Sequence, residues 1–210
     1  MADTERPVGR REQNKADKWQ RILDAATRLF AEQGYAATTT TQIAKAARIG
    51  TGSLFLYVPS KEHLLVAVFR DRMDAAWAHG VASADPGAPL VDQVVHAFGV
   101  VFDMWELSPE LMNTYLKVMP FVSLPARADI HAGVRQHMAH LNELLERARS
   151  SGALARTVST EVLAVNLYAF YFHHLQRGAA GHVTPAQARQ ELRASVELQL
   201  QHLVPRRRRS

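Results

Sequence analysis

The chain has 210 residues and a formal net charge of +5, and 47% of its residues are hydrophobic, which is typical of a globular protein. The sequence contains no cysteine, which excludes disulfides, zinc fingers and thiol catalysis and fits a cytoplasmic location. It also contains no apolar run of about 18 residues, which excludes a transmembrane helix.

The predicted elements are all helices, so the predicted fold class is all-α. Apolar residues recur with the helical period along the chain, and no stretch alternates as a strand does. We predict about nine helices, at 15–33, 41–47, 52–58, 60–80, 90–106, a sixth ending near 119, and then 126–150, 159–177 and 185–203. They group into a flexible arm (1–14), a small domain (15–65), a larger domain (66–204) and a basic tail (205–210).

Positive charge is concentrated at the two ends of the chain. Residues 1–65 carry ten Lys and Arg against seven Asp and Glu, whereas residues 66–205 carry eleven against thirteen. Arg206–Arg209 then add four positive charges. Basic ends on a near-neutral body favour a polyanionic partner such as nucleic acid, although the tail alone is equally consistent with a solubilising role.

The first three predicted helices have the spacing of a helix-turn-helix. The first carries one apolar face and ends at Gly34. Thr39 or Thr40 is the expected N-cap of the second helix, because threonine favours caps over helix interiors. In the turn that follows, we expect Gly50 to adopt a positive φ and Ile49 to be buried.

Small polar residues at the start of the third helix indicate contact with DNA. Thr51, Gly52 and Ser53 allow close approach of the backbone, and helix N-termini favour anions. In helix-turn-helix proteins these N-terminal residues enter the major groove. Lys61 follows the expected N-cap Ser60. A cation at a helix N-terminus is repelled by the helix dipole, which costs roughly 0.3–1 kcal/mol of stability, and a bound phosphate would offset this cost. A solvated lysine is the alternative.

The segment from Trp19 to Leu65 resembles the tetracycline-repressor (TetR) family of bacterial transcription regulators. The matching residues are Ile22, Leu23, Ala25, Ala26, Leu29, Phe30, Gly34, Tyr35, Thr38, Thr39, Ile43, Ala44, Ala47, Gly52, Ser53, Leu54, Phe55, Tyr57, Ser60, Lys61, Glu62 and Leu64. The resemblance implies that Thr41, Thr51, Ser53, Tyr57 and Lys61 occupy positions that touch DNA in relatives.

Three positions depart from the family pattern. Arg48 stands where a turn glycine is usual, Phe55 where tyrosine is common, and Val58 where an aromatic residue is common. Arg48 either displaces the turn or reaches a phosphate, and Phe55 lacks a hydroxyl for such an interaction. The complete predicted DNA-binding set is Thr39, Thr40, Thr41, Arg48, Thr51, Gly52, Ser53, Phe55, Tyr57 and Lys61.

The last two predicted helices are expected to pair two copies of the chain. The helix at 159–177 is apolar on several sides and therefore needs two partners, its own core and a second subunit. The resemblance implies that this helix and the one at 185–203 form a four-helix dimer interface. A dimer would present two recognition helices to a pseudo-palindromic operator. A larger monomeric core is the alternative.

The middle of the larger domain is rich in large, soft side chains that suit a pocket for an apolar or amphipathic inducer. Plain core packing is the alternative for each of them. The predicted ligand-binding residues are Phe98, Phe102, Trp105, Met112, Tyr115, Met119, Asn166, Phe172 and His173. We expect no cofactor and no metal site, because His131, His137 and His140 are better explained as surface or core histidines.

These observations favour a homodimeric DNA-binding transcriptional regulator, and a repressor over an activator. We expect an inducer bound within residues 90–175 to shift the helix at 60–80 and so to release the protein from DNA. Its predicted partners are operator DNA, a small-molecule inducer and a second copy, with no membrane. No catalytic motif is present, so an enzyme is not expected. The alternatives are a helical carrier or enzyme with a vestigial DNA-binding bundle, and a ligand-independent activator.

Overall fold

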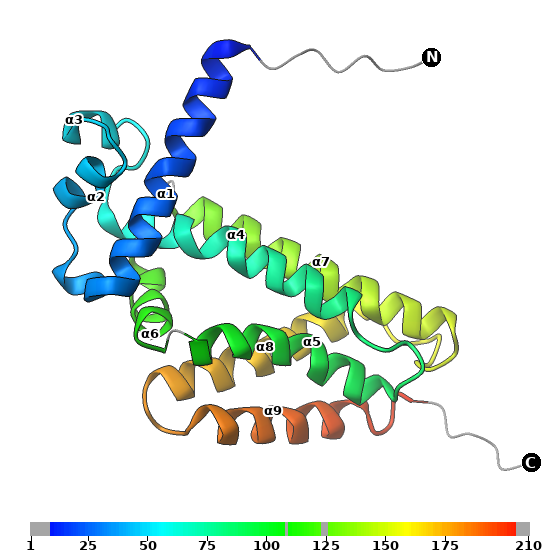
Figure 1. Cartoon of the computed structure of the whole chain (residues 1–210). Coiled ribbons are helices and arrows are strands. Elements are labelled where there is room, and N and C mark those ends of the chain that lie inside the picture. Colours follow the sequence, from blue (N-terminus) through cyan, green and yellow to red (C-terminus); the bar gives the residue numbers. More distant parts are fainter. Residues whose placement is uncertain (1–8, 108, 123–125, 205–210) are drawn as a thin grey trace, which may run out of the picture. The chain divides into compact units, whose positions relative to one another are not determined.

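The computed structural model describes residues 9–107, 109–122 and 126–204, and in these ranges it contains helices and no strand (Figure 1). The predicted all-α class is thereby confirmed. The elements are α1 (Arg10–Ala37), α2 (Thr40–Ala46), α3 (Thr51–Leu54), α4 (Lys61–Ala82), α5 (Leu90–Leu107), α6 (Pro109–Val118), the 3₁₀ turn η1 (Met119–Phe121), α7 (Ala126–Ser150), α8 (Thr160–Ala179) and α9 (Pro185–Leu200). None of these helices is both long and apolar enough to cross a membrane.

The chain divides into two compact units, Met1–Val68 and Phe69–Ser210. The boundary lies three residues after the predicted one at 65, within α4. In the first unit, α1, α2, α3 and the first turns of α4 surround one small core. Its fully buried side chains are Ile22, Ala26, Phe30, Ile43, Ala44, Leu54, Val58, Leu64 and Leu65.

Helix α1 begins earlier than the sequence predicts. Residues 10–14, which we assigned to a flexible arm, are helical, and residues 1–8 of that arm lie outside the described ranges. The predicted end at Gly34 is confirmed as a break, because Gly34 has φ 80° and ψ 160° and separates a last short turn from the main helix. Such a positive φ is readily available to glycine alone.

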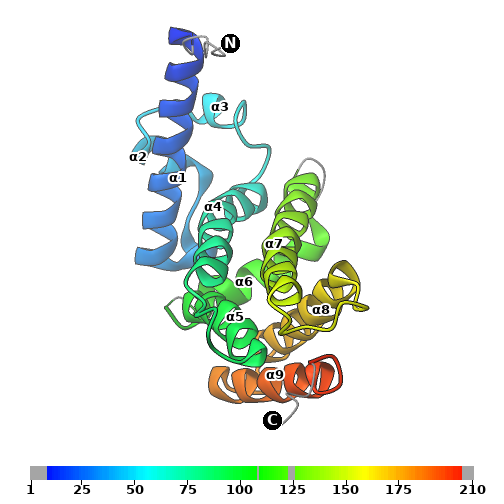
Figure 2. The ribbon, with the colours of Figure 1, turned by 90° about the vertical axis from the view of Figure 1, so that its right-hand side faces the viewer.

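In the second unit, α9 packs against α5 and α8, and α7 packs against α8 (Figure 2). Two glycines mark close helix crossings. A Cβ added at Gly80 would lie 2.7 Å from the carbonyl oxygen of Ala97, so α4 and α5 touch through their backbones. Gly178 of α8 is covered by the ring of Trp105 from α5, whose Nε1 donates a hydrogen bond to Asn113 at 3.0 Å.

Candidate nucleic-acid interface

Two threonines fix the position of α2 in the first unit. Thr39 is the N-cap: its hydroxyl accepts a hydrogen bond from the Gln42 backbone N–H, and the Gln42 side chain accepts one from the Thr39 N–H at 2.7 Å. This is a capping box, which satisfies two N–H groups that a helix start leaves free. Thr38 is buried, and its hydroxyl donates to the Gly34 carbonyl at 2.8 Å. The predicted cap at Thr39 is therefore confirmed.

The turn between α2 and α3 differs from the prediction. Gly50 has φ −71° and serves as the N-cap residue of α3, so our expectation of a positive φ there is wrong. Arg48 adopts the left-handed conformation instead, with φ 57°. The chain thus turns two residues earlier than expected, at Arg48 instead of Gly50. A left-handed conformation costs an L-residue roughly 1–2 kcal/mol, and it leaves the Arg48 side chain exposed.

Helix α3 is held by buried side chains that leave its opposite side open. Leu54 and Val58 are completely or almost completely buried, whereas Gly52, Ser53 and Phe55 are exposed. A Cβ added at Gly52 would meet no atom within 4 Å. Packing within the chain therefore does not require glycine at this position, and its bare backbone is free for the close approach of a ligand.

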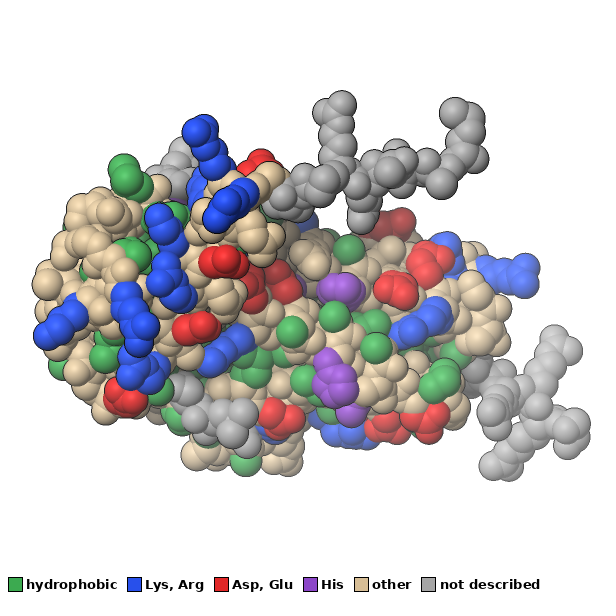
Figure 3. All heavy atoms as spheres, turned by 45° about the horizontal axis from the view of Figure 1, so that its top comes forward, with side chains coloured by type: hydrophobic (Ala, Val, Ile, Leu, Met, Phe, Trp, Pro, Cys, Tyr) green, Lys and Arg blue, Asp and Glu red, His purple; other side chains and the backbone are tan. Residues whose placement is uncertain are grey.

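The remaining predicted DNA-binding residues surround α3 in the same unit. Thr41 of α2 is exposed, Thr40 and Thr51 are half-buried, and the side chain of Thr39 is occupied by its cap. Tyr57 is half-buried and stacks on Trp19 of α1, with ring centroids 6.4 Å apart and planes 6° apart. The first unit thus brings the predicted DNA-binding set onto α2, α3, the turns that flank them and the first residue of α4. Figure 3 shows several Lys and Arg side chains on one face of this unit.

Lys61 is the first residue of α4, as predicted, and Ser60 caps that helix by accepting a hydrogen bond from the His63 N–H at 3.1 Å. The Lys61 ammonium lies 4.1 Å from the centre of the Tyr35 ring and 3.4 Å from the Ala36 carbonyl oxygen. Partial burial lowers the pKa of Lys61, and the negative charge of Glu62 raises it by a smaller amount. The cation is therefore held against the first unit by a ring and a carbonyl, with no carboxylate within salt-bridge distance in the described ranges.

The predicted ligand-binding residues separate into two groups. Phe98, Phe102, Trp105 and Met112 are buried within the second unit, with Tyr115 and Met119 half-buried nearby on α6 and η1. Tyr115 stacks on Phe69 at 4.7 Å between ring centroids, and burial raises the pKa of its hydroxyl to about 12.

Asn166, Phe172 and His173 belong to another side of α8. They follow the helical spacing of Val162, Val165 and Ala169, all three of which are exposed. The neighbouring His174, by contrast, is buried and lies 3.1 Å from the Ser195 hydroxyl of α9. The structure therefore brings Asn166 and His173 together with the outward stripe of α8 rather than with the buried aromatic residues.

A cluster that the sequence did not single out surrounds Trp77 of α4. The Trp77 ring lies 5.2 Å from Tyr171, 5.8 Å from Tyr168 and 5.3 Å from His137, measured between ring centroids. His137 is within 2.8 Å of the Asp74 carboxylate, although burial lowers its pKa overall. Among the residues that the structure describes, the Trp77 Nε1, the Tyr171 hydroxyl and the His137 Nδ1 are buried without a hydrogen-bond partner. Buried polar atoms are nearly always paired, so three unpaired ones in one cluster are unusual.

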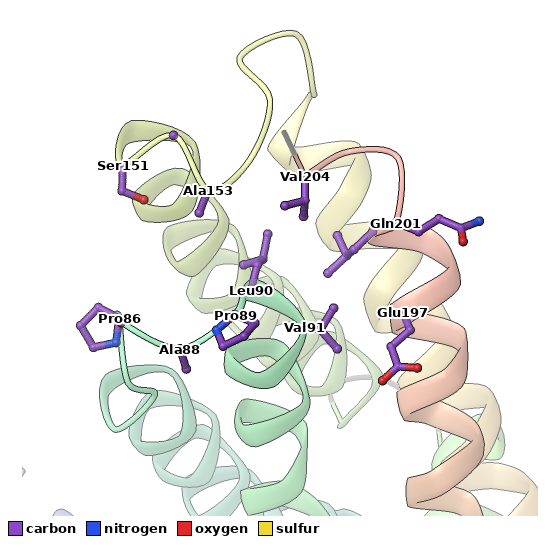
Figure 4. Close-up of a pocket in the computed structure, with 13 residues that line it drawn as sticks. Pro86, Ala88, Pro89, Leu90, Val91, Ser151, Ala153, Glu197, Gln201 and Val204 are labelled. Atoms are coloured by element: carbon purple, nitrogen blue, oxygen red, sulfur yellow. The ribbon is translucent and has the colours of Figure 1, made fainter. Parts of the chain in front are cut away.

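A groove of about 870 Å³ lies elsewhere in the second unit, between the α4–α5 connection, the end of α7 and the end of α9 (Figure 4). Pro86, Leu90, Ala153 and Val204 are among the residues that line it, and none of the predicted ligand-binding residues does. Within the described part of the chain, no group of three or more His, Asp or Glu side chains is arranged to hold a metal ion.

Residues 22–68 match the family model of bacterial regulatory proteins of the tetR family. This chain is 37% identical over 59 residues to the fatty acid metabolism regulator protein of Bacillus subtilis, a match that covers 28% of this chain and 30% of that regulator. It is 27% identical over 162 residues to the transcriptional repressor KstR of Mycolicibacterium smegmatis, covering 73% of this chain and 76% of KstR.

Solved structures extend the similarity to both units. The crystal structure of Thermus thermophilus FadR, a TetR-family repressor in complex with lauroyl-CoA, has 26% sequence identity and a TM-score of 0.70. That match covers 91% of this chain and 97% of FadR. The similarity is therefore strongest in sequence over α1 to α4 and continues as a shared fold through α9.

Proposed function

Because this chain belongs to the tetR family of bacterial regulatory proteins, we propose that it is a transcriptional repressor which a small apolar or amphipathic inducer releases from its operator. Its relatives are named as transcriptional regulators. The operator is double-stranded DNA with two related half-sites, and the protein acts on it in the cytoplasm.

One observation carries the DNA-binding half of this proposal. The buried residues Leu54 and Val58 anchor α3 so that the small residues Gly52 and Ser53 and the ring of Phe55 face outward. A helix with a small, polar N-terminal end fits the major groove, where serine reads donors and acceptors and an apolar side chain meets thymine methyls. No described residue packs against the position of a Cβ at Gly52, so the backbone there is open to a closely approaching duplex.

The direct test is binding to DNA from upstream of the protein's own gene, measured by fluorescence anisotropy at several stated salt concentrations. We expect a specific duplex to bind about 10³-fold or more tightly than a scrambled one at physiological salt. The absence of binding even at low salt would contradict the proposal and favour a helical carrier with a vestigial bundle. Transcription in vitro from the same DNA then distinguishes repression from activation.

Lys61 is expected to bind a DNA phosphate. The variant Lys61→Met keeps an unbranched stem over the Tyr35 ring and removes the charge together with the exposed hydrogen bond to the Ala36 carbonyl, so the fold should be retained. We expect weaker binding to specific and scrambled duplexes alike. The salt slope should be smaller by about 0.9 per protomer, or roughly two for a dimer on its operator, because one phosphate per protomer is no longer neutralised. Lys117→Met, at an exposed lysine on α6, is the control and should change neither quantity.

If Lys61→Met binds with the affinity and salt slope of the unaltered protein, the ammonium serves only to pack on Tyr35. That outcome would show that Lys61 does not bind a DNA phosphate, and it would not contradict the roles proposed for the other residues of the interface.

We propose that two copies pair through α8 and α9. Val162, Val165 and Ala169 form an exposed stripe on α8, and Leu198 of α9 is 68% exposed. Apolar residues exposed in rows at helical spacing are typical of an interface, and homodimers favour this kind of self-complementary surface. Two half-sites one helical turn apart require two recognition helices held at a fixed distance, which a dimer supplies.

For the inducer, we propose a long-chain lipid thioester or a molecule with a similarly apolar body. The structures of two relatives contain lauroyl-CoA and stearoyl-CoA. In this chain, the buried aromatic residues of α5 would pack against the apolar part, and the unpaired Trp77 Nε1 and Tyr171 hydroxyl would donate to a carbonyl. Thermal-shift measurements with acyl-CoAs of increasing chain length test this class, because a ligand that binds only the folded state raises the melting temperature.

The same acyl-CoAs should release the operator in the anisotropy experiment. A compound that raises the melting temperature without weakening DNA binding would be a ligand but not an inducer. If no acyl-CoA does either, another apolar class is required.

A further inference from the structure

The first three turns of α1 bury almost nothing. Every side chain from Arg10 to Lys18 is exposed, Trp19 is half-buried, and the first completely buried residue of the helix is Ile22. Helices in proteins obtain most of their stability from packing an apolar face, so a helical extension without such a face calls for another explanation. At 1.5 Å per residue these turns extend about 15 Å beyond the buried part of α1.

Three cations on this extension share one face of the helix. Arg11, Lys15 and Lys18 precede Ile22 by eleven, seven and four residues, so they continue the face of α1 that holds the core. Asp17 and Asp24 lie on the opposite face, where they accept hydrogen bonds from Gln13 and Gln20. No ion pair joins the three cations to a carboxylate in the part of the chain that the structure describes. We call Arg11, Lys15 and Lys18 the basic face of α1.

The basic face is continuous with the end of the recognition helix. A groove of about 580 Å³ is lined by Glu12, Lys15, Ala16 and Trp19 of α1 and by Leu56 and Tyr57, which follow α3. The stacking of Trp19 on Tyr57 fixes this neighbourhood. In both ribbon views α3 lies beside the N-terminal half of α1, and α1 continues past it (Figures 1 and 2). Any duplex that reaches Tyr57 therefore passes close to Lys15.

We propose that the basic face of α1 is a second DNA-binding element, which binds phosphates that flank the part of the operator read by α3. This rests on the proposed function and extends the DNA-binding surface beyond the helix-turn-helix. The three cations span about 10 Å of helix, and DNA carries one phosphate per strand for about every 3.4 Å of its axis, so the row matches a short run of the backbone. Phosphate interactions fix register without reading sequence.

The test replaces the basic face with Arg11→Gln, Lys15→Gln and Lys18→Gln together, which keeps good helix formers in place. The matched control is Arg10→Gln, Arg21→Gln and Arg28→Gln, three exposed arginines on another face of the same helix with the same change in charge. We expect the salt slope of the basic-face variant to fall by about 0.9 for each phosphate it no longer neutralises, and its binding to specific and scrambled duplexes to weaken about 100-fold or more at physiological salt. The control should change both quantities much less.

A second measurement works on the unaltered protein. Trimming the duplex at both ends to remove the flanks should weaken binding by the unaltered protein, while the basic-face variant should not distinguish the long duplex from the trimmed one. Circular dichroism and melting temperature verify that the variants remain folded.

Equal salt slopes for the basic-face and control variants, or equal binding of the long and trimmed duplexes by the unaltered protein, would overturn the inference. Failure of the proposed function is a different result: there the unaltered protein binds no specific duplex. If specific binding persists and Lys61→Met still reduces the salt slope, only the role of α1 is removed.

Discussion

Gly178→Ala is expected to lower the free energy of unfolding by about 3 kcal/mol and the melting temperature by roughly 10 °C. A Cβ at this position would lie 1.8 Å from the Trp105 ring, at its Cη2 atom, a separation that no pair of non-bonded carbon atoms adopts. The ring is 2% exposed and its Nε1 is bonded to Asn113, so it cannot move aside without losing packing and a hydrogen bond. Thermal and urea unfolding measure the change.

Gly133→Ala is the matched control, because Gly133 is also a buried helical glycine but has room for a Cβ. Its nearest neighbour would be the Asp74 Oδ1 atom at 3.8 Å, an ordinary van der Waals separation. We expect this variant to be unchanged or stabilised by up to about 1 kcal/mol. In the Gly178→Ala background, Trp105→Leu should recover part of the stability. If Trp105→Leu instead lowers the free energy of unfolding as much in this background as it does alone, the clash with Trp105 is not the cause of the destabilisation by Gly178→Ala.

Val165→Glu is expected to convert the dimer to a monomer and to weaken operator binding by about 100-fold or more. Because a twofold interface uses the same patch on both copies, one substitution places two like charges in the interface. Burying charges without partners costs several kcal/mol, which exceeds what a small apolar stripe supplies. Light scattering after size-exclusion chromatography gives the oligomeric state, and anisotropy gives the affinity for the operator.

Ala132→Glu introduces the same charge at an exposed position of α7 and should leave both the dimer and its DNA affinity intact. Leu198→Glu on α9 should behave like Val165→Glu. If both variants with a charge on α8 or α9 remain dimeric, the pairing surface lies elsewhere.

Periodicity identifies the helices because most of them pack an apolar face against a core. Both limits of α7, at 126 and 150, agree with the prediction, and the preference of threonine for caps narrows the start of α2 to Thr39 or Thr40, of which Thr39 is the cap. The same reasoning misses the first turns of α1, because a helix that buries nothing has no apolar periodicity to detect. It also places the left-handed residue at Gly50 rather than Arg48, since glycine preference is a local rule that the two packed helices override.

The candidate site is predictable where function lies in one continuous segment, and less so where it depends on tertiary structure. The residues of α2 and α3 lie within twenty positions of one another, so their arrangement follows from a local motif. Trp77 meets Tyr171 and His137 only through three helices distant in sequence, and no local pattern reveals that encounter. The side of α8 on which Asn166 and His173 lie depends on how this helix is rotated about its axis. The sequence does not reveal that rotation, because the helix is apolar on several sides.

Helix α4 carries Lys61 at its first position and Trp77 sixteen residues later, without a break between them. One uninterrupted piece of secondary structure thus bears both a residue proposed for the operator and a residue proposed for the inducer. Coupling between two such sites is reciprocal. Bound operator must lower the affinity of the protein for the inducer by the same factor by which bound inducer lowers its affinity for the operator. In a mixture of purified protein and inducer, adding operator DNA therefore raises the inducer concentration at which half of the protein is liganded, by at most that same factor.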